Sequence, residues 1–261
     1  MTRTGRRSRR KPRAALARLM PMPLTHVVPI DHTETAAVIQ RRRKVVAATS
    51  LVGAGLLGAS LSTKPGSKQF YVSTGAVAGL WTLGGLWSGP LHLGWIETRD
   101  ATLRRPVLTP VATGVAAFGF FYGCALVVRR VPVLDEAIAR VLAFADEGDN
   151  RLVLLTTLAN GLGEEVFFRG ALYAALGDRH PVASSTAVYA LATTTTRNPA
   201  LVLAAGVMGT LFSLQRRASG GLQAPLLTHV TWSALMVRYL PPLFRRAHQD
   251  AVPGRPTERN A

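Results

Sequence analysis

Residues 152–176 read LVLLTTLANGLGEEVFFRGALYAAL, and the rest of the chain is interpreted outward from this stretch. It is long enough to cross the hydrocarbon core of a bilayer, which takes about 20 mostly apolar residues. Its interior nevertheless holds Asn160, Glu164, Glu165 and Arg169. One charge at the centre of a membrane helix costs about 2.5–3.5 kcal/mol on insertion scales, so such groups face a bundle interior and pair. The stretch therefore predicts a membrane helix inside a helical bundle.

The spacing of these polar residues predicts how they divide between two faces of an α-helix. Glu165 and Arg169 are four apart, so they share a face and can form an ion pair. Glu164 lies about 100° around the helix from Glu165, without that partner and free to project into a cavity. Asn160, four residues earlier, could hydrogen-bond it. We therefore interpret Glu165 and Arg169 as a structural brace and Glu164 as the functional carboxylate.

Other apolar runs on both sides of this stretch extend the prediction to the whole chain. They lie at residues 45–61, 70–88, 107–128, 182–195, 199–214 and 222–240. Together they predict an all-α fold, a polytopic transmembrane bundle of about seven spans, within a range of six to eight. Seven spans from a cytoplasmic N-terminus would place Arg245 and Arg246 outside, against the positive-inside rule. A missed or re-entrant span would remove this conflict, and the sequence leaves the count open.

The net charge of +17 is concentrated near the N-terminus, where residues 1–44 hold twelve Lys and Arg against two acidic residues. We expect a disordered basic tail that lies in the cytoplasm and contacts anionic lipid headgroups. A plasma membrane is the expected location. No aromatic residues interleave with the basic tract, so no nucleic-acid partner is predicted. The remaining divisions are N-terminal transmembrane helices (45–128), an acidic interfacial segment (129–151), a membrane core (152–240) and a C-terminal tail (241–261).

Two later apolar runs carry polar pairs at helical spacing. His229 and Ser233 are four apart in one of them, and Tyr189 and Thr193 are four apart in another. Ser and Thr in helices often bond their own backbone, so these hydroxyls alone indicate little. A histidine that shares a membrane domain with the unpaired carboxylate of Glu164 indicates function.

Two segments of this core resemble motifs of a known family. The octapeptide GEEVFFRG at residues 163–170 resembles the first motif of the CAAX-protease and bacteriocin-processing (CPBP) family of intramembrane glutamic endopeptidases. The segment APLLTHVTWS at residues 224–233 resembles the third motif, His-x-x-x-Asn, and follows a Ser-Gly-Gly turn at residues 219–221. The resemblance covers residues 152–240, about a third of the chain, which would then be the catalytic core.

The resemblance implies a role for each residue. Glu164 would be the general base that activates a water, and His229 would stabilise the oxyanion formed on a peptide carbonyl. Glu165 and Arg169 would brace the site. The family is thought to work without metal or other cofactor. The sequence agrees, because it has no His-Glu-x-x-His and its membrane region has no third credible zinc ligand beside Glu164 and His229.

The sequence departs from the family pattern at two positions. Thr193 stands where the second motif, Phe-x-x-x-His, has its histidine, and Ser233 replaces the asparagine of the third motif. The Ser233 hydroxyl can donate to an oxyanion. Thr193 cannot take up a proton near neutral pH as imidazole can, although it could position a water. The predicted catalytic set is thus Glu164, His229, Ser233 and Thr193.

Three functions follow, in descending order of support. The first is a membrane-embedded endopeptidase whose partner is a peptide or protein substrate within the membrane. The second is a catalytically impaired relative that acts as a membrane scaffold or in self-immunity, which the threonine at position 193 favours. The third is a transporter with Glu164 and His229 as a proton relay. No inverted repeat supports this third function.

Overall fold

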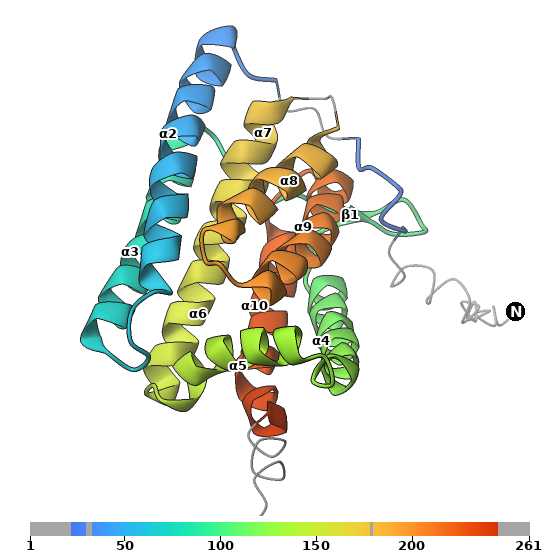
Figure 1. Cartoon of the computed structure of the whole chain (residues 1–261). Helices are drawn as coiled ribbons and strands as arrows, with labels where there is room; N and C mark the ends of the chain where they lie inside the picture. Colours follow the sequence, from blue (N-terminus) through green and yellow to red (C-terminus); the bar gives the residue numbers. More distant parts are fainter. Residues whose placement is uncertain (1–21, 30–32, 178–179, 245–261) are drawn as a thin grey trace, which may run out of the picture.

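The computed structural model describes residues 22–29, 33–177 and 180–244. Within these ranges the fold is almost entirely helical (Figure 1). The exception is a short antiparallel hairpin of β1 (Ile96–Glu97) and β2 (Leu103–Arg104), in which Ile96 pairs with Arg104 and Glu97 with Leu103. The all-α prediction is confirmed apart from this hairpin.

Helices form where the apolar runs predict them. Their bounds are α2 (Ala36–Ser60), α3 (Lys68–Ser88), α4 (Leu108–Val128), α5 (Pro132–Asp146), α6 (Asn150–Glu164), α7 (Tyr173–Leu176), α8 (Pro181–Thr194), α9 (Pro199–Ser219) and α10 (Gln223–Tyr239). A π-helix, η1 (Glu165–Leu172), joins α6 to α7. The predicted helix at residues 152–176 is therefore α6, η1 and α7 in succession. Among the described helices only α4 and α9 are both long and apolar enough to cross a membrane, so a seven-span bundle is not confirmed.

Local sequence signals explain where several helices begin and end. Thr35, Ser67, Asp149 and Asn198 each accept hydrogen bonds from backbone N–H groups in the first turn of the helix that follows. Such N-caps satisfy donors that have no partner inside the helix. Helix α9 ends at Ser219 and is followed by Gly220, whose φ of +67° is a left-handed conformation that glycine adopts without strain.

Helix α2 starts earlier than the sequence predicted. Residues 36–44, assigned to the disordered tail, are helical, and Arg42 among them is fully buried. Its guanidinium pairs with the carboxylate of Glu34 and donates to Ser88 Oγ at 3.0 Å and to the Pro90 carbonyl at 2.9 Å. Part of the basic cluster therefore belongs to the folded interior. Residues 1–21 and 245–261, which hold most of the predicted tails, lie outside the described residues.

The continuous helical segment formed by α6 and η1 lies at the centre of the fold. Helices α2 and α3 lie on one side of it, and α8, α9 and α10 lie on the other (Figure 1). This segment packs closely against α3: a Cβ added at Gly163 would lie only 2.7 Å from the Ala78 carbonyl oxygen. Trp81 of α3 packs on Phe167 and Phe168, with ring centroids 4.6 and 5.0 Å apart. This aromatic core fixes the position of η1.

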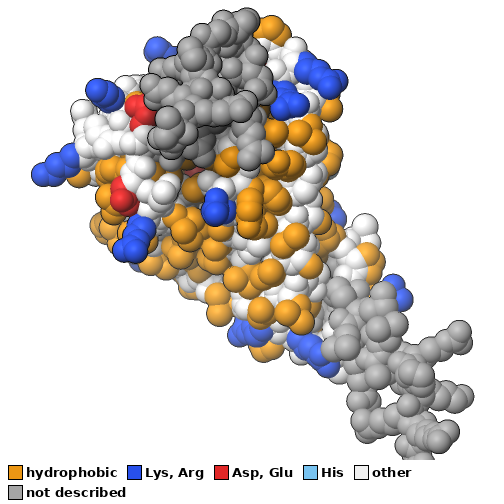
Figure 2. Space-filling view, turned by 90° about the horizontal axis from the view of Figure 1, so that it is seen from below, with side chains coloured by type: hydrophobic (Ala, Val, Ile, Leu, Met, Phe, Trp, Pro, Cys, Tyr) orange, Lys and Arg blue, Asp and Glu red, His pale blue; other side chains and the backbone are white. Residues whose placement is uncertain are grey.

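Apolar side chains are also abundant on the surface. Leu51 of α2, Trp87 of α3 and Leu108 of α4 are each at least 70% exposed. Figure 2 shows hydrophobic side chains over much of one face of the described molecule. Extended apolar surface of this kind marks a membrane or protein interaction face. It agrees with the two membrane-compatible helices, α4 and α9.

Candidate active site

The charged motif lies at the junction between α6 and η1. Glu164 is the last residue of α6 and Glu165 the first of η1, all of whose residues are buried. The π-helix is rare and occurs mostly as short insertions at functional sites. Two side chains from other helices bond to its carbonyls. Ser185 Oγ donates to the Phe168 carbonyl at 3.0 Å, and Arg216 Nε donates to the Arg169 carbonyl at 2.8 Å. These tertiary contacts support the wider turn.

Glu165 and Arg169 form the predicted ion pair, and Glu165 also contacts the histidine. Arg169 Nη1 donates to Glu165 Oε1 at 3.3 Å, and His229 Nδ1 lies 2.8 Å from the same oxygen. Glu165 and Arg169 are fully buried. An ionised carboxylate only accepts hydrogen bonds, so Nδ1 would carry the proton of this contact when Glu165 is ionised. Nε2 of His229 therefore faces away from Glu165, and Glu165 does more than brace Arg169.

Glu164 lies on the other side of the same imidazole. Its Oε2 is 4.0 Å from His229 Nε2 and accepts a hydrogen bond from the Tyr189 hydroxyl at 2.6 Å. The Asn160 amide instead donates to the carbonyls of Thr156 and Thr74, at 2.9 and 3.3 Å. The predicted contact between Asn160 and Glu164 is thus wrong. The two glutamates approach His229 from its two ring nitrogens, and of the two only Glu164 lines the cavity.

Aromatic side chains hold the imidazole of His229 in place. Phe212 of α9 stacks on it, with centroids 4.7 Å apart and planes 18° apart, and Trp232 lies 5.9 Å away. On the α6 side, a Cβ added at Gly161 would lie 3.3 Å from His229 Cδ2. The ring therefore has little freedom to turn away from the two carboxylates.

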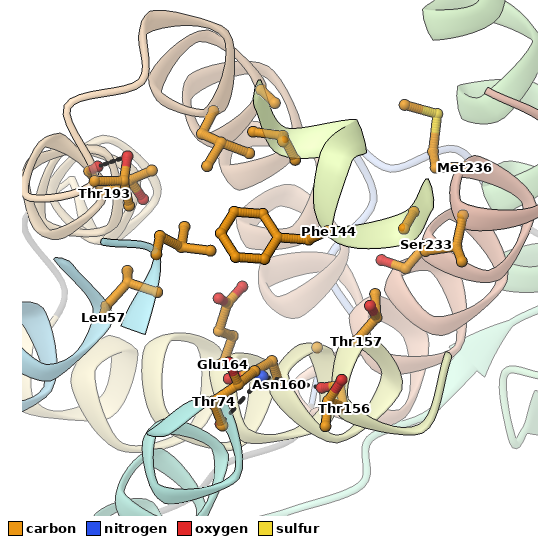
Figure 3. A pocket seen from close by; sticks show the side chains of 18 of the residues that line it. Leu57, Thr74, Phe144, Thr156, Thr157, Asn160, Glu164, Thr193, Ser233 and Met236 are labelled. Carbon is orange, nitrogen blue, oxygen red and sulfur yellow. Dashed lines mark hydrogen bonds between the residues drawn. The ribbon is translucent and has the colours of Figure 1, made fainter. Parts of the chain in front are cut away.

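A cavity of about 310 Å³ brings together the four residues predicted to be catalytic, Glu164, Thr193, His229 and Ser233. Its remaining lining is mostly apolar and includes Leu57, Phe70, Phe144, Met208, Trp232, Met236 and Leu240. Figure 3 shows the Glu164 carboxylate pointing into this space. An apolar cavity with a few convergent polar groups is the usual form of a ligand or substrate site.

Thr193 and Ser233 lie on opposite sides of the cavity in Figure 3, with Glu164 between them in that view. The Thr193 hydroxyl donates to the Tyr189 carbonyl of its own helix at 2.9 Å. Ser233 follows His229 by one turn of α10 and is 5% exposed. Both residues thus line the cavity with the glutamate and the histidine.

Tyr189 is the site residue to which the sequence analysis gave no role. Its phenol bonds Glu164, and its ring lies under the Arg169 guanidinium, 4.6 Å from ring centroid to Cζ. The only signal was its spacing of four residues from Thr193, which places both on one face of α8. A tyrosine in an apolar helix is indistinguishable by sequence from a packing aromatic.

These observations define a buried carboxylate–histidine site within a helical domain that has membrane-compatible helices. Residues 149–235 match the family model described as Type II CAAX prenyl endopeptidase Rce1-like. The match contains all the polar site residues described above and is consistent with the resemblance of this part of the chain to the CPBP family. The match supports a membrane protease in general. Neither the curated proteins nor the solved structures contain a match to the chain.

Proposed function

We propose that the protein is an intramembrane endopeptidase of the CPBP type, which hydrolyses peptide bonds with a water activated by Glu164. The observation that carries the proposal is the approach of Glu164 Oε2 to within 4.0 Å of His229 Nε2 inside one cavity. This separation places the carboxylate that would accept the proton of the water beside the imidazole that would donate to the oxyanion. A separation of about 10 Å, well beyond hydrogen-bond reach, would have excluded joint action.

The chemistry divides between the two sides of the substrate carbonyl. Glu164 takes a proton from the attacking water as the new C–O bond forms, and returns it to the amide nitrogen as the C–N bond breaks. His229, protonated on both nitrogens, donates from Nε2 to the oxyanion while Glu165 holds Nδ1. Ser233 supplies a second donor one turn further along α10, and the Thr193 oxygen helps to position the water.

Glu165 and Arg169 set the electrostatics around the histidine. Glu165 Oε1 receives both Arg169 Nη1 and His229 Nδ1, so one buried oxygen ties the charged motif of η1 to α10. A carboxylate hydrogen-bonded to imidazole fixes its orientation and stabilises the imidazolium form. Glu165 and Arg169 therefore help to orient His229 so that its Nε2 faces the substrate.

The mostly apolar lining of the cavity supports a peptide or protein substrate that enters from within the membrane. The proposal includes a multi-pass protein in the plasma membrane with a cytoplasmic N-terminus. Its support is the membrane-compatible length of α4 and α9, the exposed apolar residues on α2 to α4, and the basic residues before α2. Anionic headgroups would be held by Arg41, Arg43 and Lys44, which are exposed on α2.

The direct test is cleavage of a peptide library by the purified protein in detergent or nanodiscs, with products identified by mass spectrometry. We expect the wild-type protein to cleave, and Glu164→Gln to lose at least about 100-fold of the rate while remaining folded. A matched control is Glu136→Gln, on the acidic segment outside the cavity lining. Cleavage that survives Glu164→Gln, or a wild-type protein that cleaves no library member, refutes the proposal.

One observation favours a second function, a non-proteolytic membrane scaffold or immunity protein. Thr193 stands in place of the second-motif histidine, and its hydroxyl donates to the backbone of α8. A scaffold needs the fold but not the carboxylate. Glu164→Gln should then leave a cellular phenotype intact, whereas a protease should lose it at normal protein abundance.

A further inference from the structure

Tyr189 makes a direct hydrogen bond to the glutamate that the proposed function places at the centre of catalysis. Its hydroxyl donates to Glu164 Oε2 at 2.6 Å. The other oxygen, Oε1, makes no hydrogen bond with the described residues. One oxygen of the carboxylate is therefore held by the phenol, and the other is available to a water.

The ring of Tyr189 is positioned as firmly as its hydroxyl. It packs against Phe168 with centroids 4.7 Å apart, and the Arg169 guanidinium lies over its face at 4.6 Å. Gly209 leaves room on α9, since a Cβ there would lie 3.1 Å from Tyr189 Cδ1. The residues that hold the ring thus include Arg169, which is paired with Glu165.

These contacts join the two glutamates, through His229 on one side and through Tyr189 and Arg169 on the other. His229 joins Glu165 on its Nδ1 side and faces Glu164 on its Nε2 side. Tyr189 bonds Glu164 through its hydroxyl and contacts Arg169 through its ring. Without the phenol, the Glu164 side chain would have no hydrogen-bond donor among the described residues to fix its orientation.

The Tyr189 hydroxyl lies on α8, the helix on which residue 193 departs from the family pattern. Position 193 carries threonine in place of histidine, and the Thr193 hydroxyl donates to the carbonyl of Tyr189. Tyr189 is one turn earlier on the same face of α8, and both residues line the cavity. A phenol donor is therefore present on the helix from which the family pattern supplies an imidazole.

We propose that Tyr189 is the positioning residue for Glu164 and takes the place of the second-motif histidine in this protein. Its hydroxyl holds Oε2 near His229 Nε2 and leaves Oε1 to accept the proton of the attacking water. The proposal rests on the proposed endopeptidase function. It explains how a chain with Thr193 in the histidine position can retain an oriented catalytic carboxylate.

The test is Tyr189→Phe, which keeps the ring between Phe168 and Arg169 and removes only the hydroxyl. In the peptide-cleavage assay we expect kcat to fall roughly 10- to 100-fold with KM nearly unchanged, because a misoriented catalytic group costs rate on this scale. Tyr239→Phe is the matched control: Tyr239 is 51% exposed at the end of α10, and its kcat should equal that of the wild type.

A rescue variant separates a positioning role from a structural one. Adding Thr193→His to Tyr189→Phe brings an imidazole into the same cavity, one turn along α8, and should raise kcat at least threefold over Tyr189→Phe alone. Lost packing would not be restored in this way. An unchanged kcat in Tyr189→Phe, or a lowered kcat that Thr193→His fails to raise, overturns the proposal. If the double variant does not fold, a raised KM with unchanged kcat in Tyr189→Phe overturns it.

The outcomes also distinguish this inference from the proposed function. Loss of cleavage in Glu164→Gln with full activity in Tyr189→Phe would refute the role of Tyr189 and leave the endopeptidase in place. Cleavage that persists in Glu164→Gln would refute the endopeptidase mechanism itself.

Discussion

Glu165 Oε1 and His229 Nδ1 lie 2.8 Å apart, a contact between η1 and α10 that joins residues 64 positions apart in the sequence. Through this contact the charged motif at residues 164–169 forms a site together with a residue of a separate helix. The same oxygen accepts from Arg169, so the histidine, the glutamate and the arginine are coupled. Changes in any one of them should affect the other two.

Removal of Glu165 should destabilise the fold strongly. Glu165→Ala leaves the fully buried Arg169 without its partner, and breaking a buried pair in this way costs about 3–5 kcal/mol. Thermal unfolding in detergent measures the loss. The double variant Glu165→Leu with Arg169→Met should lose less than Glu165→Ala alone, because no uncompensated charge is buried. A double variant less stable than Glu165→Ala would contradict this account of the pair.

Gly161→Ala should separate activity from stability. The added Cβ would meet His229 Cδ2 at 3.3 Å and tilt the imidazole, so we expect kcat to fall severalfold. Alanine favours a helix over glycine by up to about 1 kcal/mol, so the melting temperature should hold or rise. Gly119→Ala on α4 is the control, since nothing lies within 4 Å of its Cβ. Equal kcat values in the two variants would show that His229 tolerates displacement.

Phe212→Leu should lower kcat about tenfold by removing the ring that stacks on His229. Its matched control is Phe120→Leu, because Phe120 on α4 is 60% exposed and distant from the cavity lining. Steady-state kinetics with a cleaved library peptide make the comparison. A Phe212→Leu enzyme that matches the Phe120→Leu enzyme would exclude a role for the stack.

The protein should remain in the membrane pellet after washing with alkaline carbonate and should be released by detergent. The physical reason is the exposed apolar surface on α2, α3 and α4, whose transfer to water costs about 25 cal/mol for each Å². Immunoblotting of pellet and supernatant fractions checks this. Release by carbonate alone would contradict the proposed multi-pass insertion.

The sequence predicted the helices and the polar groups of the site well, because both follow from local patterns. Long apolar runs and capping residues such as Asp149 mark helices without reference to the rest of the fold. Ionisable residues inside such runs, Glu164 and His229 among them, must face other protein groups. These features therefore indicate the polar site residues from the sequence alone.

What the sequence missed depends on tertiary contacts. The π-helical turn of η1 is accompanied by bonds from Ser185 and Arg216, which come from other helices, so a local pattern did not predict it. The contact of Glu165 with His229 also joins two separate helices. Burial of Arg42 likewise depends on Ser88 and Pro90, which no local pattern connects to it. The role of Tyr189 required knowing which way its hydroxyl points.

The central claim is that Glu164 and His229 act on one substrate as a unit. A double-mutant cycle on kcat/KM with Glu164→Gln, His229→Gln and the double variant tests it most directly. We predict that each single variant loses about 100- to 10,000-fold and that the double variant loses little more, since groups in one catalytic unit are not additive. Losses that multiply in the double variant, or cleavage that either single variant retains, would contradict the account.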